Sequence, residues 1–393
     1  MNWVSILEGI AAGAAYFTLP GSIELTQLTA GALLPLRKPR AMEAKPVRLA
    51  VVIPAHNEEE CIARCLQSLR ACDPAMDPRD IYVVADNCND KTAEIARVNN
   101  VSVLERHNLT HRGKGYALEF AFGYLRRAYD AFVIVDADSV VPQGFLESFR
   151  KSFAKGAQAL QCYYLVGNPD ETTTTRLMDL SLRAFNMVRP RGRARWNQSV
   201  GILGNGFGLT RKTLEKVPYT AKSVVEDLEY HIELLRTGIK VELLAETHVY
   251  GLMPVSTKAR STQRARWEGG RLRMIREFAP RLMGEVFSGR TECIEPLLDL
   301  LLLPLSFHVL LLTFAAIAGH GMMRWIGVGG LAIVLLHLIA AIAAGNSVMR
   351  DLRAIASVPG YVLWKILRLP MIVATSARGS AWVRTERTTR EAA

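Results

Sequence analysis

Residues 132–138 have the sequence FVIVDAD, in which a run of four apolar residues ends in two aspartates separated by one alanine. The run is short and rich in β-branched residues, which indicates a buried strand. Residues 81–86 (IYVVAD) have the same character and also end in an aspartate. In an open parallel sheet, Asp86, Asp136 and Asp138 would project into one crevice. Two carboxylates with one residue between them can approach a hard divalent ion.

Strands and helices alternate around this stretch from Val47 to about Pro280. The predicted strands are Arg48–Ile53, Ile81–Ala85, Val101–Leu104 and Phe132–Val135, and helices are predicted at Thr92–Val98 and Tyr116–Arg127. Repeated βα units predict an α/β fold with a mostly parallel sheet that binds its ligands at the carboxyl ends of the strands.

Two apolar runs follow, Leu297–Gly319 and Trp325–Gly345, and each has the length that crosses a bilayer core of about 30 Å. Only His320–Arg324 separate them, so we expect a transmembrane hairpin. Arg350 and Arg353 come next and place both ends of the hairpin on the cytoplasmic side, because short basic segments stay inside.

The N-terminal segment is apolar in two parts, Trp3–Leu19 and Ile23–Leu36, with Pro20 between them. Their lengths fit one kinked span and a re-entrant or interfacial pair equally well. Basic residues at positions 37–40 place the following domain in the cytoplasm.

The segment Val358–Ala377 is apolar but interrupted by Lys365, Arg368 and Pro370, which favours an amphipathic element in the membrane plane over a span. The predicted organisation is a membrane element (1–40), a catalytic domain (47–280), a transmembrane hairpin (297–345) and an interfacial segment with a basic tail (358–393).

Charge and cysteine content exclude other classes of protein. The 393 residues carry a formal net charge of +11, and the basic clusters flank apolar segments, so we expect membrane lipids as partners and no nucleic acid. The six cysteines form no CxxC pair, which argues against a zinc site or a disulfide frame.

Five motifs occur in a fixed order: the strand and turn VVIPAHNE (51–58), the strand ending at Asp86, the DAD of residues 136–138, the pair Glu226-Asp227, and QRARW (263–267). In this order they resemble the family 2 glycosyltransferases, and the QxxRW motif resembles the membrane branch that contains cellulose, hyaluronan and chitooligosaccharide synthases. The resemblance implies a GT-A-like nucleotide-sugar-binding domain.

The resemblance implies a UDP-sugar donor and a divalent cofactor, Mg²⁺ or Mn²⁺, on Asp136 and Asp138. The residues expected to bind the donor are Pro54, Ala55, His56, Asn57, Glu58, Asp86, Lys114, Asp136, Gln263 and Arg266. For Lys114, which follows Gly113, a solvated helix start explains the sequence equally well.

Catalysis is assigned by the same resemblance to Asp227 as the base, with Glu226 orienting its neighbours and the sugar carbon inverted. Trp267 and the run Gly204, Asn205 and Gly206 are expected to contact the acceptor, although a plain turn also explains this run. On a helix, Gln263, Arg266 and Trp267 share one face, which suits a guanidinium on a diphosphate and an indole under a sugar ring. His248 is a candidate additional metal ligand, although a lone histidine is more often structural.

The sequence therefore predicts an integral inner- or plasma-membrane protein, with its catalytic domain cytoplasmic, that transfers a sugar from a nucleotide-sugar donor to a glycan or lipid-linked acceptor. An extending polysaccharide, with export-machinery proteins as further partners, and a single sugar added to a lipid remain alternative products. A non-catalytic nucleotide-binding membrane scaffold is the alternative from another class.

Overall fold

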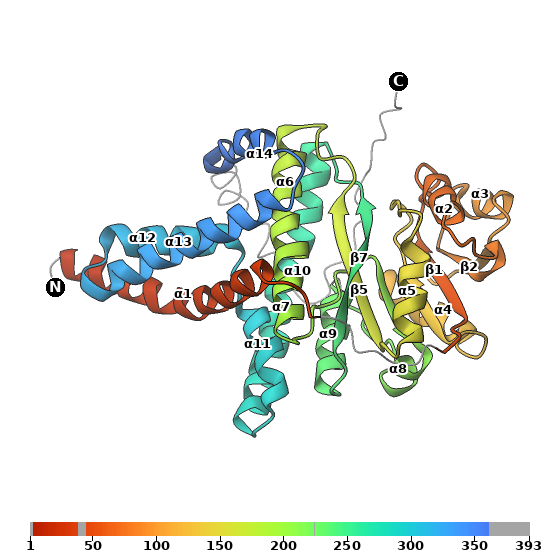
Figure 1. Cartoon of the computed structure of the whole chain (residues 1–393), viewed down its shortest axis with the longest axis horizontal. Helices are drawn as coiled ribbons and strands as arrows, with labels where there is room; N and C mark the ends of the chain where they lie inside the picture. The colour runs from red at the N-terminus through yellow and green to blue at the C-terminus, as the bar shows by residue number, and fades with distance from the viewer. Residues whose placement is uncertain (1–2, 38–44, 224, 361–393) are drawn as a thin grey trace.

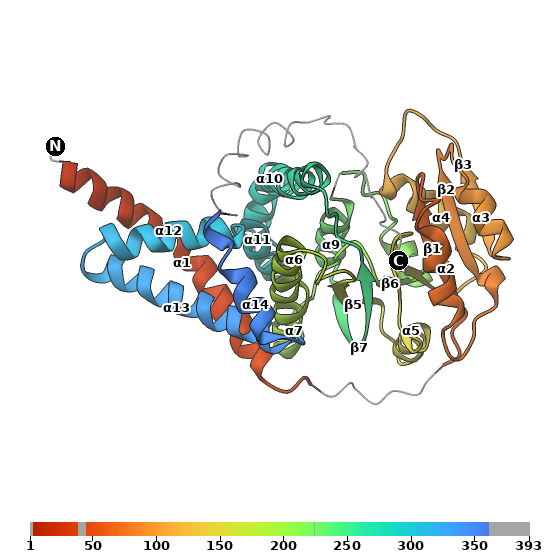
Figure 2. The same cartoon turned by 90° about the horizontal axis from the view of Figure 1, so that it is seen from above.

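A computed structural model describes residues 3–37, 45–223 and 225–360. Three layers follow one another in Figure 1: the helices α1 (Trp3–Leu33), α12 (Leu305–Ala318) and α13 (Gly321–Ala343) extend to one side, and the sheet lies on the other. Between them stand α6 (Thr173–Arg183), α7 (Arg189–Arg195) and α10 (Thr257–Phe287), as the view from above in Figure 2 also shows.

The sheet has seven strands in the order β3-β2-β1-β4-β6-β5-β7. The strands are β1 (Leu49–Ala55), β2 (Ile81–Asp86), β3 (Ser102–Arg106), β4 (Ala131–Ile134), β5 (Ala159–Val166), β6 (Phe207–Thr210) and β7 (Val241–Gly251). Among these strands β6 alone runs antiparallel to its neighbours, β4 and β5. The predicted α/β fold with a mostly parallel sheet is confirmed, and the predicted strands coincide with β1 to β4 within two residues.

Each face of the sheet has its own apolar core, because side chains alternate along a strand. Val51 and Ile53 of β1 pack toward α2 (Ile62–Arg70), α3 (Thr92–Val98) and α5 (Phe145–Ala154). Ala50 and Val52 pack toward α4 (Lys114–Leu125), α8 (Arg211–Lys216) and α9 (Glu226–Arg236). Covering both faces leaves the carboxyl edge of the strands as the place for a site.

Within the described residues, two helices are long and apolar enough to cross a membrane, Ser5–Leu33 within α1 and Gly321–Ala343, and a bent pair would make a third span. The N-terminal segment is a single helix that continues through Pro20, so of the two arrangements open from the sequence the structure has the continuous one.

The segment Leu297–Gly319, expected as one transmembrane helix, does not form a single continuous helix. The chain forms α11 (Ile294–Leu301) and α12, which are bent by 80° with respect to each other. Pro304 causes the break, because proline has no N–H for the helix and holds the preceding residue extended. The last described helix is α14 (Val348–Ile355), and residues 361–393, which contain most of the expected interfacial segment, lie outside the described residues.

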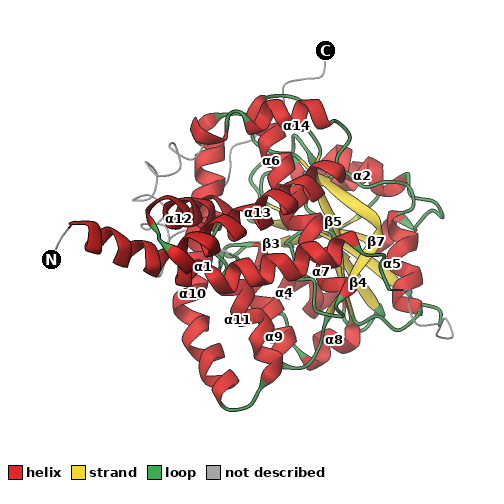
Figure 3. Cartoon of the chain, turned by 60° about the vertical axis from the view of Figure 1, so that its left-hand side comes forward, coloured by secondary structure: helices red, strands yellow, loops and turns green. Residues whose placement is uncertain are grey.

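Polar contacts within the helical part tie α1 to the C-terminal helices, which lie beside it in Figure 3. Ser22 Oγ lies 3.2 Å from His308 Nε2, and Thr29 Oγ1 lies 2.9 Å from His337 Nδ1. A Cβ on Gly192 would come within 2.1 Å of the carbonyl oxygen of Leu28, so α7 can approach α1 this closely only with a glycine there.

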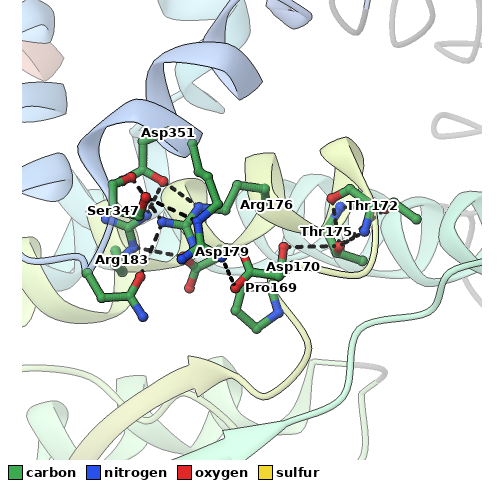
Figure 4. A network of polar contacts seen from close by, with 11 residues as sticks. Pro169, Asp170, Thr172, Thr175, Arg176, Asp179, Arg183, Ser347 and Asp351 are labelled. Atoms are coloured by element: carbon green, nitrogen blue, oxygen red, sulfur yellow. Dashed lines mark hydrogen bonds and ion pairs between the residues drawn. The ribbon is translucent and has the colours of Figure 1, made fainter. Parts of the chain in front are cut away.

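A buried ionic network fastens α14 to α6 (Figure 4). The fully buried Asp351 accepts hydrogen bonds through Oδ1 from Arg176 Nε (2.6 Å) and Arg183 Nη2 (2.8 Å). Arg183 also contacts Asp179 (3.0 Å), and Arg176 contacts Asp170 (3.2 Å). The network therefore connects the end of the membrane helices to a helix that borders the sheet.

Candidate active site

A cavity of about 1580 Å³ opens at the carboxyl edge of the sheet and reaches the apolar helices α1, α12 and α13. At the sheet it is lined by turn residues and carboxylates, among them Pro54, Ala55, His56, Glu58, Asp86, Asp136, Asp138, Glu226 and Asp227. At its far end it is lined by apolar residues of α1, α12 and α13, among them Leu25, Leu305, Val309, Leu331, Val334 and Leu338. One cavity thus extends from the polar edge of the sheet to an apolar wall formed by these three helices.

The turn after β1 is held against the end of β2. His56 Nδ1 lies 2.7 Å from the carbonyl oxygen of Asp86, to which it donates a hydrogen bond. Asn57 has a φ of 55°, and its Oδ1 accepts a hydrogen bond from the backbone N–H of Asn89 at 2.9 Å. Asn57 therefore helps to fix the loop. Of the residues Pro54–Glu58, it alone is not among those that line the cavity.

Asp86 is almost fully buried and is fixed by two donors. Its Oδ1 accepts hydrogen bonds from Arg106 Nη1 at 2.6 Å and from Asn87 Nδ2 at 3.0 Å. Arg106 reaches Asp86 because the two residues are paired across β2 and β3. Sequence reasoning missed Arg106, since the predicted strand ended at Leu104, although a basic residue in register with an acidic strand end is a usable signal.

Asp136 and Asp138 follow β4 and both line the cavity. The Asp136 carboxylate forms an ion pair with the ammonium group of Lys114, and Asp138 accepts a hydrogen bond from Ser139 Oγ at 3.3 Å. Lys114 also donates to the carbonyl oxygen of Gly204. Lys114 therefore connects the two sides of the cavity at the sheet edge.

The two aspartates present oxygen atoms of the kind that Mg²⁺ and Mn²⁺ prefer. Within the part of the chain that the structure describes, no group of three His, Cys, Asp or Glu side chains could hold an ion by itself. The two carboxylates fit an ion whose remaining ligands are diphosphate oxygens or water. His248 is not among the residues lining the cavity, and its ring packs against Tyr250 with centroids 4.6 Å apart.

Asn205 and Gly206 lie behind the cavity wall. The buried Asn205 accepts through Oδ1 from the backbone N–H of Asp136 (3.0 Å) and donates through Nδ2 to Ser139 Oγ (2.8 Å). Gly206 has a φ of 65°, and a Cβ there would lie 2.6 Å from Val249. Both residues brace the Asp136 loop, and of the predicted Gly204–Gly206 run Gly204 alone is among the residues that line the cavity.

Glu226 and Asp227 lie in the first turn of α9, and Asp227 faces Gly204, where a Cβ would lie 3.1 Å from Asp227 Oδ2. Burial, and then the neighbouring Asp227, raise the pKa of Glu226 to about 7. Burial also raises the pKa of Asp227, although the backbone N–H of Leu228 and the charge of Lys114 act in the opposite direction. Glu226 can therefore exchange a proton near neutral pH, and Asp227 holds its proton more tightly than an exposed aspartate does.

The helix α10 carries Gln263, Arg266 and Trp267 on the cavity wall, as their helical spacing predicts. Arg266 is close enough to Glu226 to lower its pKa, against the larger effect of burial. Gly270 makes this approach feasible, because a Cβ there would lie 2.6 Å from Val225 at the start of α9. Sequence reasoning missed Gly270. The feature that could have revealed it is its position one helical turn after Arg266, a predicted donor-binding residue.

Residues 46–270 match the profile of a family described as Glycosyltransferase like family 2. The chain belongs to this family. The matched range covers the sheet and the first 14 of the 31 residues of α10, so it contains every predicted site residue of the cavity.

Individual relatives agree with this family. The chain is 26% identical over 242 residues to "Probable glycosyltransferase YdaM" of Bacillus subtilis, covering 59% of this chain and 57% of that protein. It is 26% identical over 236 residues to a beta-monoglucosyldiacylglycerol synthase of Synechocystis, covering 58% and 49%. The chain therefore spans about half the length of these curated relatives.

A solved structure shares the fold over nearly the whole chain. It is the mannosyltransferase PcManGT from Pyrobaculum calidifontis, crystallised with GDP-Man and Mn²⁺, which superposes with a TM-score of 0.53 at 18% identity. The superposition covers 96% of this chain and 99% of that one, so the likeness in fold extends to the helices at both ends.

This family 2 chain has a further polar group in the cavity that sequence reasoning missed. His231 lies one turn after Asp227 on α9 and accepts or donates a hydrogen bond with Ser199 Oγ at 2.8 Å. Burial lowers the pKa of His231 to about 4, so the ring is neutral at physiological pH. Arg189, Arg193 and Asp299 continue the wall from there toward the membrane helices.

Proposed function

We propose that this chain transfers a sugar from a nucleotide diphosphate donor, a UDP-sugar, to a lipid-linked acceptor at the cytoplasmic face of the membrane. The observation that carries the proposal is the single cavity with carboxylates at one end and membrane-helix side chains at the other. A water-soluble acceptor would have no use for the apolar end, whereas a lipid could place its polar head at the carboxylates and its chain along α1, α12 and α13.

The donor binds in this proposal at the sheet edge, between the β1 turn, Asp86 and α10. Asp136 and Asp138 would hold Mg²⁺ or Mn²⁺, which when bound neutralises charge on the diphosphate leaving group. Arg266 contributes a charge-assisted contact to the same diphosphate, and Gln263 a neutral hydrogen bond. Lys114 would exchange its present partner, Asp136, for the phosphates.

Proton transfer is assigned to Asp227, which takes the proton of the acceptor hydroxyl as that oxygen attacks the sugar from the face opposite the diphosphate. The outcome is inversion at the anomeric carbon. Glu226, with a pKa of about 7, orients its neighbours and keeps the local charge low. Gly204 and Trp267 line the space left for the acceptor and the sugar ring.

An extending polysaccharide is the second candidate product. It is favoured by residues 263–267, which resemble the QxxRW motif of the membrane synthase branch. It would require a path for a growing chain and the help of export proteins. The cavity's apolar end and the few membrane helices favour the lipid-linked product.

The domain arrangement completes the proposal. In this proposal, residues 47–280 form the cytoplasmic catalytic domain, and the helices within 1–40 and 297–345 anchor it in the inner or plasma membrane. The interfacial segment expected at 358–393 lies mostly outside the described residues. Basic residues at positions 37–40, 350 and 353 support this orientation.

The experiment uses the full chain in detergent micelles with a panel of UDP-sugars and Mn²⁺, and measures nucleotide release and product mass. We expect one sugar added to a lipid extract and no transfer to water-soluble oligosaccharides. Asp227→Asn is the matched variant: it should still bind UDP, while turnover falls by about 10²–10⁴-fold, as for a lost general base.

A ladder of polysaccharide masses would replace the lipid proposal by the polysaccharide one. Tight UDP binding without any sugar transfer, unchanged in Asp227→Asn, would instead support the non-catalytic scaffold.

A further inference from the structure

The junction between the catalytic domain and the membrane helices contains a group of arginines around Asp299 of α11. Arg189 Nη2 lies 3.0 Å from Asp299 Oδ1, and Arg271 donates to the backbone carbonyl oxygen of Asp299. Both arginines line the cavity. Two guanidinium groups from different helices, α7 and α10, therefore converge on one residue at the cavity wall.

These two arginines have donor atoms left over. The Nε atoms of Arg189 and of Arg271 are buried and have no hydrogen-bond partner among the described residues. A buried N–H without a partner costs about 1–3 kcal/mol, so an acceptor oxygen entering the cavity would be favoured there. Burial also lowers the pKa of Arg189, although Asp299 acts to raise it, and a further anion would stabilise the charged form.

Arg193, two residues from Arg189, differs because its charge is already matched. It contacts Glu24 at 2.7 Å, Asp299 at 2.9 Å and Glu295 at 3.1 Å. Three carboxylates from α1 and α11 occupy this guanidinium, so it holds the helices together. Arg189 and Arg271 are thus the members of the group with capacity for a ligand.

The helix α10 relates this group to the donor end of the cavity. Gln263, Trp267 and Arg271 recur every four residues, lie on one face of the helix, and all line the cavity. With a rise of 1.5 Å per residue, Arg271 lies about 12 Å beyond Gln263 along the helix. A phosphate at Arg271 is therefore separate from a donor diphosphate at Gln263 and Arg266.

The wall next to the arginines is apolar. Leu25 of α1, Val309 of α12, and Leu331 and Leu338 of α13 line the same cavity. Phe185 also lines it, and the guanidinium of Arg189 lies 4.6 Å from the centre of its ring. A lipid with an anionic head group requires two features: cationic hydrogen-bond donors for the head group and an apolar groove for its hydrocarbon chain. Both are present here.

We propose that Arg189 and Arg271 bind the phosphate of a membrane lipid whose hydrocarbon chain lies between α1, α12 and α13. This inference rests on the proposed function, since it names the chemical class of the lipid acceptor. The phosphate is bound by the two guanidinium groups through charge and hydrogen bonds. The reacting hydroxyl belongs to a group that this phosphate carries, and it points toward Asp227.

The test measures lipid retention by the full-length chain in maltoside micelles, using native mass spectrometry. Two pairs of probes differ only in the phosphate: an isoprenyl phosphate with its isoprenol, and a phosphatidic acid with its diacylglycerol. We expect at least one phosphate lipid to be retained about tenfold or more over its alcohol, because a charged hydrogen bond contributes about 1.5–3 kcal/mol.

The variants are Arg189→Gln and Arg271→Gln, each of which should reduce retention of the phosphate lipid about tenfold. Arg191→Gln is the matched control on the same helix: Arg191 donates to the carbonyl oxygen of Ala32 and is not among the residues lining the cavity, so retention should not change. UDP titration of each variant checks that the catalytic domain is folded, and Arg271→Gln keeps the test valid should Arg189→Gln not fold.

Equal retention of phosphate lipids and their alcohols by the unmodified chain would overturn the inference, as would equal losses in Arg191→Gln and Arg271→Gln. Displacement of the lipid by millimolar inorganic phosphate would assign the site to free phosphate and also overturn it. Selective retention without sugar transfer would leave the phosphate site standing and refute the proposed function alone. Sugar transfer to an uncharged lipid would support the proposed function and refute the phosphate site alone.

Discussion

The two ends of the cavity both contain partly or fully buried charge, but they balance it differently. At the sheet edge, the carboxylates Asp136, Asp138, Glu226 and Asp227 line one space with Lys114. Lys114 forms its ion pair with Asp136 and acts on Glu226 and Asp227 only over a distance, so the pKa of both carboxyl groups stays raised. This end has an excess of negative charge that a cation or a proton can relieve.

Among the helices beyond the other end of the cavity, several buried carboxylates lie in direct contact with arginines. Asp351 lies within 2.6 Å of Arg176 and 2.8 Å of Arg183, and Glu24 lies 2.7 Å from Arg193. Such pairs add little net stability compared with an apolar core, but breaking one of them is costly. The difference teaches that buried carboxylates in direct contact with arginines fix the position of helices here, whereas carboxyl groups with raised pKa values mark the place for chemistry.

The largest effect is expected from removing charge at the sheet edge. Asp138→Asn should reduce turnover at least about 10³-fold, since the diphosphate would lose the ion that offsets its charge. The thermal midpoint should change little, because asparagine keeps the shape of the aspartate side chain and can still accept the hydrogen bond from Ser139 Oγ. Sugar transfer, Mn²⁺ titration by calorimetry and a melting curve check the three statements.

Asp130→Asn is the control for this variant, because Asp130 lies outside the cavity and its side chain is 48% exposed. Full turnover by Asp138→Asn, or turnover of the unmodified chain in excess EDTA, would contradict the assignment of the cation to this pair.

The second effect concerns the matched end. Asp351→Asn should lower the free energy of unfolding by about 3 kcal/mol, because it leaves Arg176 and Arg183 buried without their shared carboxylate. The thermal midpoint should fall by roughly 3–5 °C for a chain of this length. Asp170→Asn removes a 46% exposed partner of the same network and should change the midpoint by no more than about 2 °C. Equal shifts in the two variants would refute the comparison.

Much of the sheet edge could be predicted from the sequence because it depends on local signals. A strand that ends in Asp86 or in Asp136 is visible in the sequence, and a parallel sheet brings such ends together. The shared helical face of Gln263 and Trp267 follows from their spacing alone.

The membrane end could not be predicted in this way, because its contacts join distant segments. Arg193 contacts Glu24 across 169 residues, and no spacing rule relates them. The break before α12 had a visible cause in Pro304, but the hydropathy of Leu297–Gly319 concealed it. Asn205 had the sequence of an exposed turn, yet its side chain turns inward to hold Asp136.

The smallest effect sharpens the description of the sheet edge and concerns Lys114, whose charge lowers the pKa of both Glu226 and Asp227 against the larger effect of burial. Lys114→Met should therefore raise both pKa values. A general base works in its ionised form, so the rise of kcat/KM with pH should move to higher pH by about one unit.

Lys222→Met is the matched control, because Lys222 lines the same cavity but pairs with Glu119 and lies over the ring of Tyr116. Its profile should stay in place when both are measured at saturating Mn²⁺. A shift to lower pH in Lys114→Met, or the same shift in both variants, would mean that neither Glu226 nor Asp227 is the general base.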